Sequence, residues 1–149
     1  IKSIVVRIFN TTGHKKVNDV CSDFTKRAIE IEKGKRKDFP VGNLETKRAI
    51  TDVRDAIEAF YLCLEKGKIG EVYNLSGNKV YSGNDILEII KKLTGLKFNV
   101  VEDKKLLRPS EEPVIFGDSS KFKKDTGWEQ KIELEKTIKD MLDWWRENE

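Results

Sequence analysis

The sequence is poor in the residue types from which most catalytic and metal sites are built. It contains one histidine, His14, and two cysteines, Cys21 and Cys63, which are far apart and match no metal-binding or redox spacing. A lone imidazole provides neither a serine–histidine–acid set nor a metal cluster. We therefore expect His14 in a surface loop and both cysteines buried as small hydrophobic residues.

Long apolar runs and a large excess of one charge are also absent. No segment approaches the roughly 20 apolar residues that cross a bilayer, and no signal-peptide pattern is present. The net charge is only +3, with basic residues interspersed among acids. We therefore expect a cytoplasmic protein that binds neither membranes nor nucleic acid, in which a few placed arginines hold any anionic ligand.

Phosphate-binding and hydride-transfer motifs are missing as well. The chain has no Gly-x-Gly-x-x-Gly and no Walker loop, and its nearest approach to Tyr-x-x-x-Lys runs from Tyr61 to Glu65, which has the wrong charge. We therefore assign no catalytic, cofactor-binding or metal-binding residue to this chain.

Short strands alternate with amphipathic helices, which predicts an α/β fold with helix as the larger share. Residues 2–10 predict a strand whose near-continuous apolar run is typical of burial on both faces in a parallel sheet. Residues 23–33 predict a helix that ends at Gly34, and Asp52 is expected to cap another. The apolar face of that second helix is expected to consist of Val53, Ala56, Ile57, Phe60 and Leu64.

A few polar residues are candidates for ligand binding. Arg108 precedes Pro109, which disfavours helix at the preceding residue, so its guanidinium is expected to be held extended and able to meet a diphosphate bidentately. Glu111 could accept hydrogen bonds from sugar or ribose hydroxyls. Arg48 is expected in a loop ahead of the second helix, and Asn10 follows the first strand, where ligands bind in open α/β sheets. The alternatives are a surface arginine beside a turn and an ordinary turn asparagine.

Several segments occur in an order that is specific in combination. They are Val6–Gly13, Val41–Arg48, Thr51–Asp55, Gly70–Asn74, Leu107–Glu111 and Lys124–Trp128. Together they resemble the C-terminal half of the extended short-chain dehydrogenases that act on nucleotide sugars, and the GDP-mannose 4,6-dehydratase family in particular. The resemblance covers nearly the whole chain.

The resemblance implies that this chain is the substrate domain of an extended Rossmann-type enzyme whose cofactor-binding half lies upstream. Residues 1–10 would be the last strand of the Rossmann sheet, and residues 11–149 the substrate domain. Asn10 would contact the sugar or diphosphate, and Val20 the nucleotide through its backbone. Arg48 and Arg108 would hold the diphosphate, and Glu111 a hydroxyl group.

The family reaction uses NADP: hydride leaves the sugar C4, water is eliminated across C5–C6, and hydride returns to C6. The resemblance therefore implies a GDP-sugar substrate and paired subunits in the full-length enzyme, whereas this chain alone is expected to be inactive. Departures leave the substrate open: Thr11 stands where the family has histidine, His14 where it has proline, and Asp23 near a lysine of one branch. A related reductase or epimerase, a stand-alone nucleotide-binding module and a structural remnant without a ligand remain as alternatives.

Overall fold

The computed structural model describes residues 2–108 and 110–149 and confirms the α/β class. Its strands are β1 (Val5–Ile8), β2 (Asn10–Thr12), β3 (Asp38–Val41), β4 (Lys47–Asp52), β5 (Val72–Leu75), β6 (Val80–Ser82), β7 (Asn99–Glu102) and β8 (Val114–Ile115). Its helices are α1 (Val20–Glu32), α2 (Val53–Lys66), α3 (Gly83–Thr94), α4 (Ser120–Thr126) and α5 (Leu134–Asn148), with a 3₁₀ turn, η1, at Lys104–Leu106.

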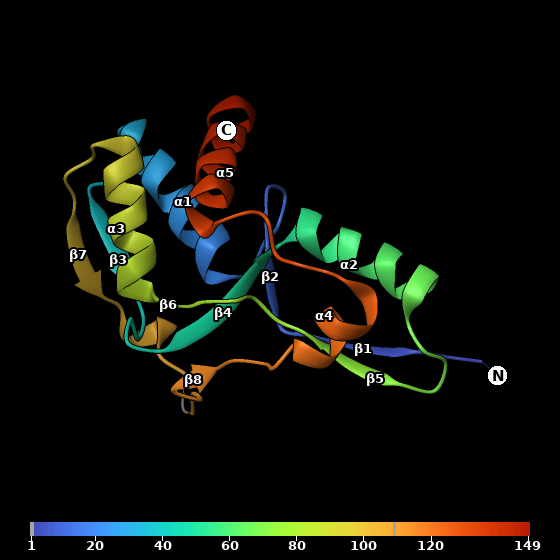
Figure 1. The fold of residues 1–149 in the computed structure, drawn as a ribbon. Helices are drawn as coiled ribbons and strands as arrows, with labels where there is room; N and C mark the ends of the chain where they lie inside the picture. Colours follow the sequence, from blue (N-terminus) through green and yellow to red (C-terminus); the bar gives the residue numbers. More distant parts are fainter. Residues whose placement is uncertain (1, 109) are drawn as a thin grey trace.

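The strands form small sheets, and β4 is the hub of the largest. It pairs in parallel with β2 and β8 and antiparallel with β6, while β1 pairs with β5 and β3 with β7, both in parallel. Figure 1 shows β2 and β4 crossing the middle of the molecule. Helices α1, α3 and α5 lie together beyond one end of these strands, and α2 and α4 lie with the β1–β5 pair beyond the other.

Two hydrophobic clusters stabilise these two regions. Helices α1, α3 and α5 enclose the first, in which the Phe39 ring stacks on Phe98 at 4.5 Å between centroids and meets the edge of Phe24 at 5.3 Å. The second is built from α2, α4 and β5 around Tyr73 and Trp128, both fully buried. Burying such a side chain contributes roughly 1.5–3 kcal/mol, so each cluster can hold its elements in place.

The first strand differs from the prediction. The predicted strand is interrupted at Phe9. Strand β1 pairs with β5, whereas β2 turns away and pairs with β4. Among the described residues β1 has no other strand partner, and the side chains of Val5 and Ile8 are each 49% exposed. The prediction of one strand buried on both faces is therefore wrong for this chain.

Both predicted helices are present, but the start of one and the buried face of the other differ from the prediction. Helix α1 begins at Val20, three residues earlier than predicted, because Asp19 caps it. Asp52 caps α2 as predicted, yet the small residues Ala56, Ala59 and Cys63 are buried against α4 and β5, as part of the second cluster. Of the predicted apolar face only Ala56 is buried, whereas Ile57 is 62% and Leu64 84% exposed.

The expectations for the rarer residues are confirmed. Cys21 and Cys63 are free and buried, and burial raises the pKa of both thiols. His14 is exposed in the turn between β2 and α1. Across the described ranges, no helix is both long and apolar enough to cross a membrane, and no group of histidine, cysteine or acidic residues could hold a metal ion.

Candidate functional site

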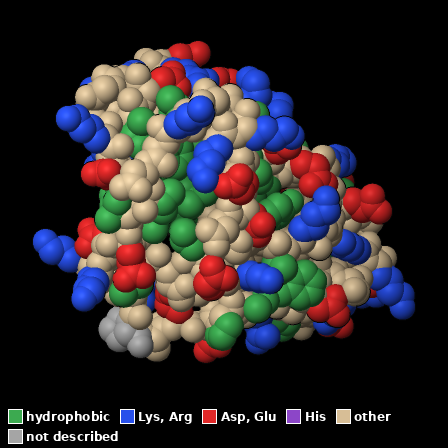
Figure 2. Space-filling model, turned by 90° about the vertical axis from the view of Figure 1, so that its left-hand side faces the viewer, with side chains coloured by type: hydrophobic (Ala, Val, Ile, Leu, Met, Phe, Trp, Pro, Cys, Tyr) green, Lys and Arg blue, Asp and Glu red, His purple; other side chains and the backbone are tan. Residues whose placement is uncertain are grey.

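A cavity of about 1070 Å³ lies where β2, β4, the start of α1 and the loop after η1 meet. All five residues that the sequence nominated line it: Asn10, Val20, Arg48, Arg108 and Glu111. They come from distant parts of the chain, so the fold, and not local sequence, brings them together. Figure 2 shows a face of the molecule on which apolar side chains lie among basic and acidic ones of interspersed sign.

Arg48 lies in strand β4, and the prediction that it lies in a loop is wrong. Residues 47–52 form a strand because they pair with β2, β6 and β8. The Arg48 Nη1 donates to the carbonyl oxygens of Lys47 and Glu112, each at 2.8 Å. Asn10 lies on the neighbouring strand, opposite Ile50. Two adjacent parallel strands therefore present Arg48 and Asn10 to the same cavity.

Arg108 and Glu111 lie on the loop between η1 and β8. The Arg108 Nε is 3.9 Å from the Glu111 Oε1, and the Arg108 side chain is 74% exposed, so its guanidinium is open to an anionic ligand. Gly42 allows this loop to approach, because a Cβ there would lie 2.6 Å from the Leu106 carbonyl oxygen. Pro109, expected to hold Arg108 extended, lies outside the described residues.

Val20 is the first residue of α1, and its position brings a helix N-terminus to the cavity wall. Asp19 already occupies that positive end: its carboxylate accepts hydrogen bonds from the Ser22 N–H at 2.7 Å and the Thr12 hydroxyl at 3.0 Å. A phosphate placed there would meet a carboxylate. The wall formed by α1 is therefore less suited to phosphate than the wall that carries Arg48 and Arg108.

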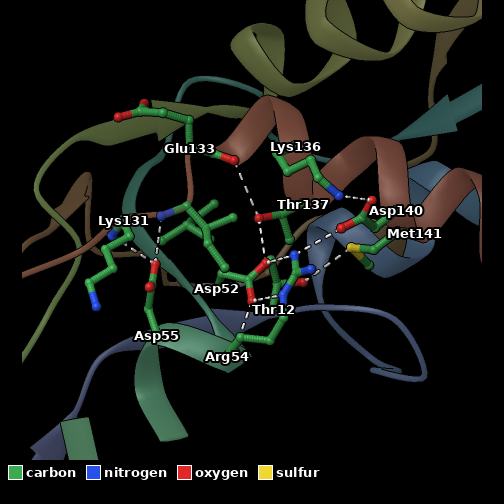
Figure 3. A network of polar contacts seen from close by, with 12 residues as sticks. Thr12, Asp52, Arg54, Asp55, Lys131, Glu133, Lys136, Thr137, Asp140 and Met141 are labelled. Atoms are coloured by element: carbon green, nitrogen blue, oxygen red, sulfur yellow. Dashed lines mark hydrogen bonds and ion pairs between the residues drawn. The ribbon is translucent and has the colours of Figure 1, made fainter. Parts of the chain in front are cut away.

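A buried polar network fixes the C-terminal end of β4 (Figure 3). The Asp52 carboxylate accepts two hydrogen bonds from the Arg54 guanidinium, at 2.9 and 2.8 Å, and one from the Thr137 hydroxyl at 2.7 Å. Burial disfavours the Asp52 charge, but these donors hold its pKa below the ordinary value. Arg54 also pairs with Asp140 at 2.9 Å, so α5 is tied to β4. Arg54 thus has a structural ion-pair role.

The sequence did not nominate other charged residues that line the cavity. Lys16, Asp23, Arg27 and Lys105 do so as well. Asp23 and Arg27 are four residues apart on α1, a spacing that places opposite charges on one helix face. That spacing is a weak signal because surface ion pairs share it, and Asp23 was noted only as a departure from one branch of the family.

The comparisons with known proteins agree with this fold. Residues 1–141 match the family model described as GDP-mannose 4,6 dehydratase. The chain belongs to the GDP-mannose 4,6-dehydratase family. The resemblance inferred from the sequence is thus confirmed, and the family is one of nucleotide-sugar enzymes.

Relatives within and around the GDP-mannose 4,6-dehydratase family cover most of the chain. A GDP-6-deoxy-D-mannose reductase of Pseudomonas aeruginosa is 23% identical over 95% of this chain and 47% of its own length. GDP-mannose 4,6 dehydratase 1 of Arabidopsis thaliana is 30% identical over 85% of this chain and 35% of its own length. The solved structure of RMD from Pseudomonas aeruginosa with NADPH shares the fold, with a TM-score of 0.90 at 22% identity over 97% of this chain and 48% of that chain. The chain thus spans half or less of the relatives it matches.

Proposed function

We propose that this chain is the substrate-binding part of an NADP-dependent enzyme similar to GDP-mannose 4,6-dehydratase, and that its cavity binds the nucleoside diphosphate of a GDP-sugar. The observation that carries the proposal is the meeting of Asn10, Val20, Arg48, Arg108 and Glu111 around one cavity. Family membership supports the substrate class, since the matched relatives are named for GDP-sugars.

In this proposal the diphosphate lies between Arg48 and Arg108. The Arg48 Nη1 donates hydrogen bonds to two carbonyl oxygens, and the other N–H groups of the guanidinium remain available for phosphate oxygens. Arg108 is exposed and can form the paired hydrogen bonds that suit a phosphate. Glu111 would accept a hydroxyl hydrogen bond, Asn10 would contact the sugar or diphosphate, and Val20 would contact the nucleotide through its backbone.

The same proposal divides the chain in two. Residues 1–10 would complete a larger cofactor-binding sheet, a role supported by the half-exposed apolar side chains of β1, and residues 11–149 would form the substrate domain. NADP does not fit the residues present, because the chain has no Gly-x-Gly-x-x-Gly loop and no Tyr-x-x-x-Lys pair. The chain therefore supplies substrate binding, and the hydride chemistry belongs to residues outside it.

Titration calorimetry or ligand-detected NMR with GDP tests the proposal. Two charge-assisted arginine contacts in an open site should give a Kd on the order of 0.1–1 mM. Added salt should weaken this binding, because solvent reaches both guanidinium groups. A chain that remains folded by circular dichroism but binds no GDP at millimolar concentration would contradict the proposal.

A further inference from the structure

Thr12, the last residue of β2, is a buried polar residue at a point where three elements meet. It is 3% exposed, and its hydroxyl donates a hydrogen bond of 3.0 Å to the Oδ2 of Asp19, the residue that caps α1. The same hydroxyl lies 3.7 Å from the Met141 Sδ on α5 (Figure 3). A thioether is a weak acceptor, so the carboxylate is the main partner of this buried hydroxyl.

The hydrogen bond between Thr12 and Asp19 joins the two ends of the loop between β2 and α1. This loop, residues 13–18, contains two non-glycine residues with a left-handed backbone, Lys15 at a φ of 67° and Asn18 at 63°. Such a conformation is unfavourable for residues other than glycine and persists only where the surrounding structure holds it. A bond across the ends of the loop provides that support.

The Asp19 carboxylate passes this constraint on to the first turn of α1. Its other oxygen, Oδ1, accepts a hydrogen bond from the Ser22 N–H at 2.7 Å, and the Ser22 hydroxyl donates to the Asp19 carbonyl oxygen at 3.0 Å. One carboxylate thus connects the end of β2 to the start of the helix. Val20, the first residue of α1, and loop residues 16–18 line the cavity.

We propose that Thr12 is a positioning residue for nucleotide binding, because its hydroxyl fixes the start of α1, and Val20 with it, relative to Asn10. The inference rests on the function proposed above, in which Asn10 and Val20 both contact the ligand. Strand β2 is itself fixed, since it pairs with β4 from Asn10, opposite Ile50, to Thr12, opposite Asp52. The strand is therefore the reference for both contacts, and Thr12 ties the helix to it.

Loss of the Thr12 hydroxyl should weaken binding without removing any group that contacts the ligand. The loop and the first turn of α1 would then sample other positions, and the ligand would have to order them on binding. Thr12→Val, which exchanges the hydroxyl for a methyl group of similar size, should raise the Kd for GDP about three- to fivefold. Thr12→Ser keeps the hydroxyl and should bind GDP within about twofold of the parent, although it loses a buried methyl group.

Two comparisons distinguish positioning from a general loss of stability. Thr126→Val is the matched control, because Thr126 is a 1% exposed residue of α4 outside the cavity, and its hydroxyl donates to the Phe122 carbonyl oxygen at 2.7 Å. This variant should lower the Tm but leave the Kd unchanged. In an Asp19→Ala background, Thr12→Val should have no further effect on the Kd, because the partner of the hydroxyl is already gone.

Ligand-detected NMR with GDP on the 149-residue chain measures each Kd, and circular dichroism measures each Tm. Parental affinity in Thr12→Val overturns the inference while GDP binding stands, and so does an equal loss in Thr12→Ser or in Thr126→Val. If Thr12→Val does not fold, Thr12→Ala removes the same hydroxyl and is judged in the same way. If the parent binds no GDP, the proposed function is overturned and this inference with it.

Discussion

Arg48 in β4 donates its Nη1 hydrogen bond to the carbonyl oxygen of Glu112, 64 residues further along the chain, at 2.8 Å. The Lys47 N–H adds a bond of 2.8 Å to the Pro113 carbonyl oxygen, and β8 pairs with the same strand. The strand with one proposed diphosphate arginine and the loop with the other are thus one hydrogen-bonded unit. Such preorganisation reduces the ordering cost of binding a ligand.

Removing the Arg48 side chain should loosen that loop. In Arg48→Met the Glu112 carbonyl loses its guanidinium donor, a charge-assisted hydrogen bond. Amide exchange of residues 110–112 should therefore become several-fold faster. Lys47→Met is the matched control, because Lys47 holds the loop through its backbone N–H. Equal exchange rates in Arg48→Met and the parent would show that the hydrogen bond from Arg48 to Glu112 does not hold the loop against the strand.

The buried network at Asp52 should contribute strongly to stability. Asp52→Ala removes the α2 cap and three hydrogen bonds to a fully buried carboxylate, and should lower the free energy of unfolding by about 3 kcal/mol. Asp143→Asn, which removes only exposed pairs, should change it by less than about 0.5 kcal/mol. Urea denaturation measures both, and similar losses in the two variants would show that the network is not a major stabilising element.

The same carboxylates should make stability depend on acid pH. The pKa values of Asp52 and Asp140 are lowered in the folded chain: burial opposes their charges, but hydrogen bonds to Arg54, Thr137 and Lys136 outweigh it. Their contribution is therefore complete above the unfolded pKa of 3.8 and is lost as pH falls through the lower folded values. The Tm should be nearly constant from about pH 5 to 7 and fall below about pH 4. In Asp52→Asn the decrease of Tm below about pH 4 should be smaller than in the parent. The same decrease in both proteins would show that Asp52 does not cause the loss of stability in acid.

The open side of β1 should promote self-association. Its half-exposed Val5 and Ile8 lie on a strand with one pairing partner among the described residues, and uncovered strand edges recruit further strands. Light scattering should detect oligomers, and Val5→Lys should reduce them, because an edge lysine opposes pairing. Ile69→Lys, which changes an exposed residue outside the strands, should have little effect. A strictly monomeric parent with strongly protected amides in residues 4–8 would contradict this prediction.

The sequence predicts local features well and distant contacts poorly. A cap such as Asp52 depends on neighbouring residues, and it forms as predicted. The capping box at Ser82 and Asp85 is equally local. Arg48 was misplaced because its strand exists only through pairing with β2, β6 and β8. Thr137 meets Asp52 across 85 residues, which no local pattern reveals.

The apolar face of α2 shows a second limit of the sequence. Helical periodicity selects the larger side chains Ile57 and Leu64, yet the small Ala59 and Cys63 are buried, because the helix lies close to α4 and β5. Periodicity identifies an apolar stripe, but only tertiary packing decides which stripe is covered. Local sequence made Asn10, Arg48, Arg108 and Glu111 candidates, the motif resemblance gave each a role, and Val20 came from the resemblance alone.

The most direct test of the proposed site is GDP binding by Arg108→Lys. Lysine keeps the charge but cannot reproduce the paired guanidinium hydrogen bonds, so the Kd should rise about tenfold. Lys35→Met and Lys37→Met are controls, because these exposed lysines lie outside the cavity and should change the Kd by less than about twofold. Titration calorimetry at one salt concentration compares the three variants with the parent. A tenfold loss confined to Arg108→Lys is the predicted result, whereas parental affinity in Arg108→Lys, or a larger loss in either control, would contradict the assignment of the diphosphate site.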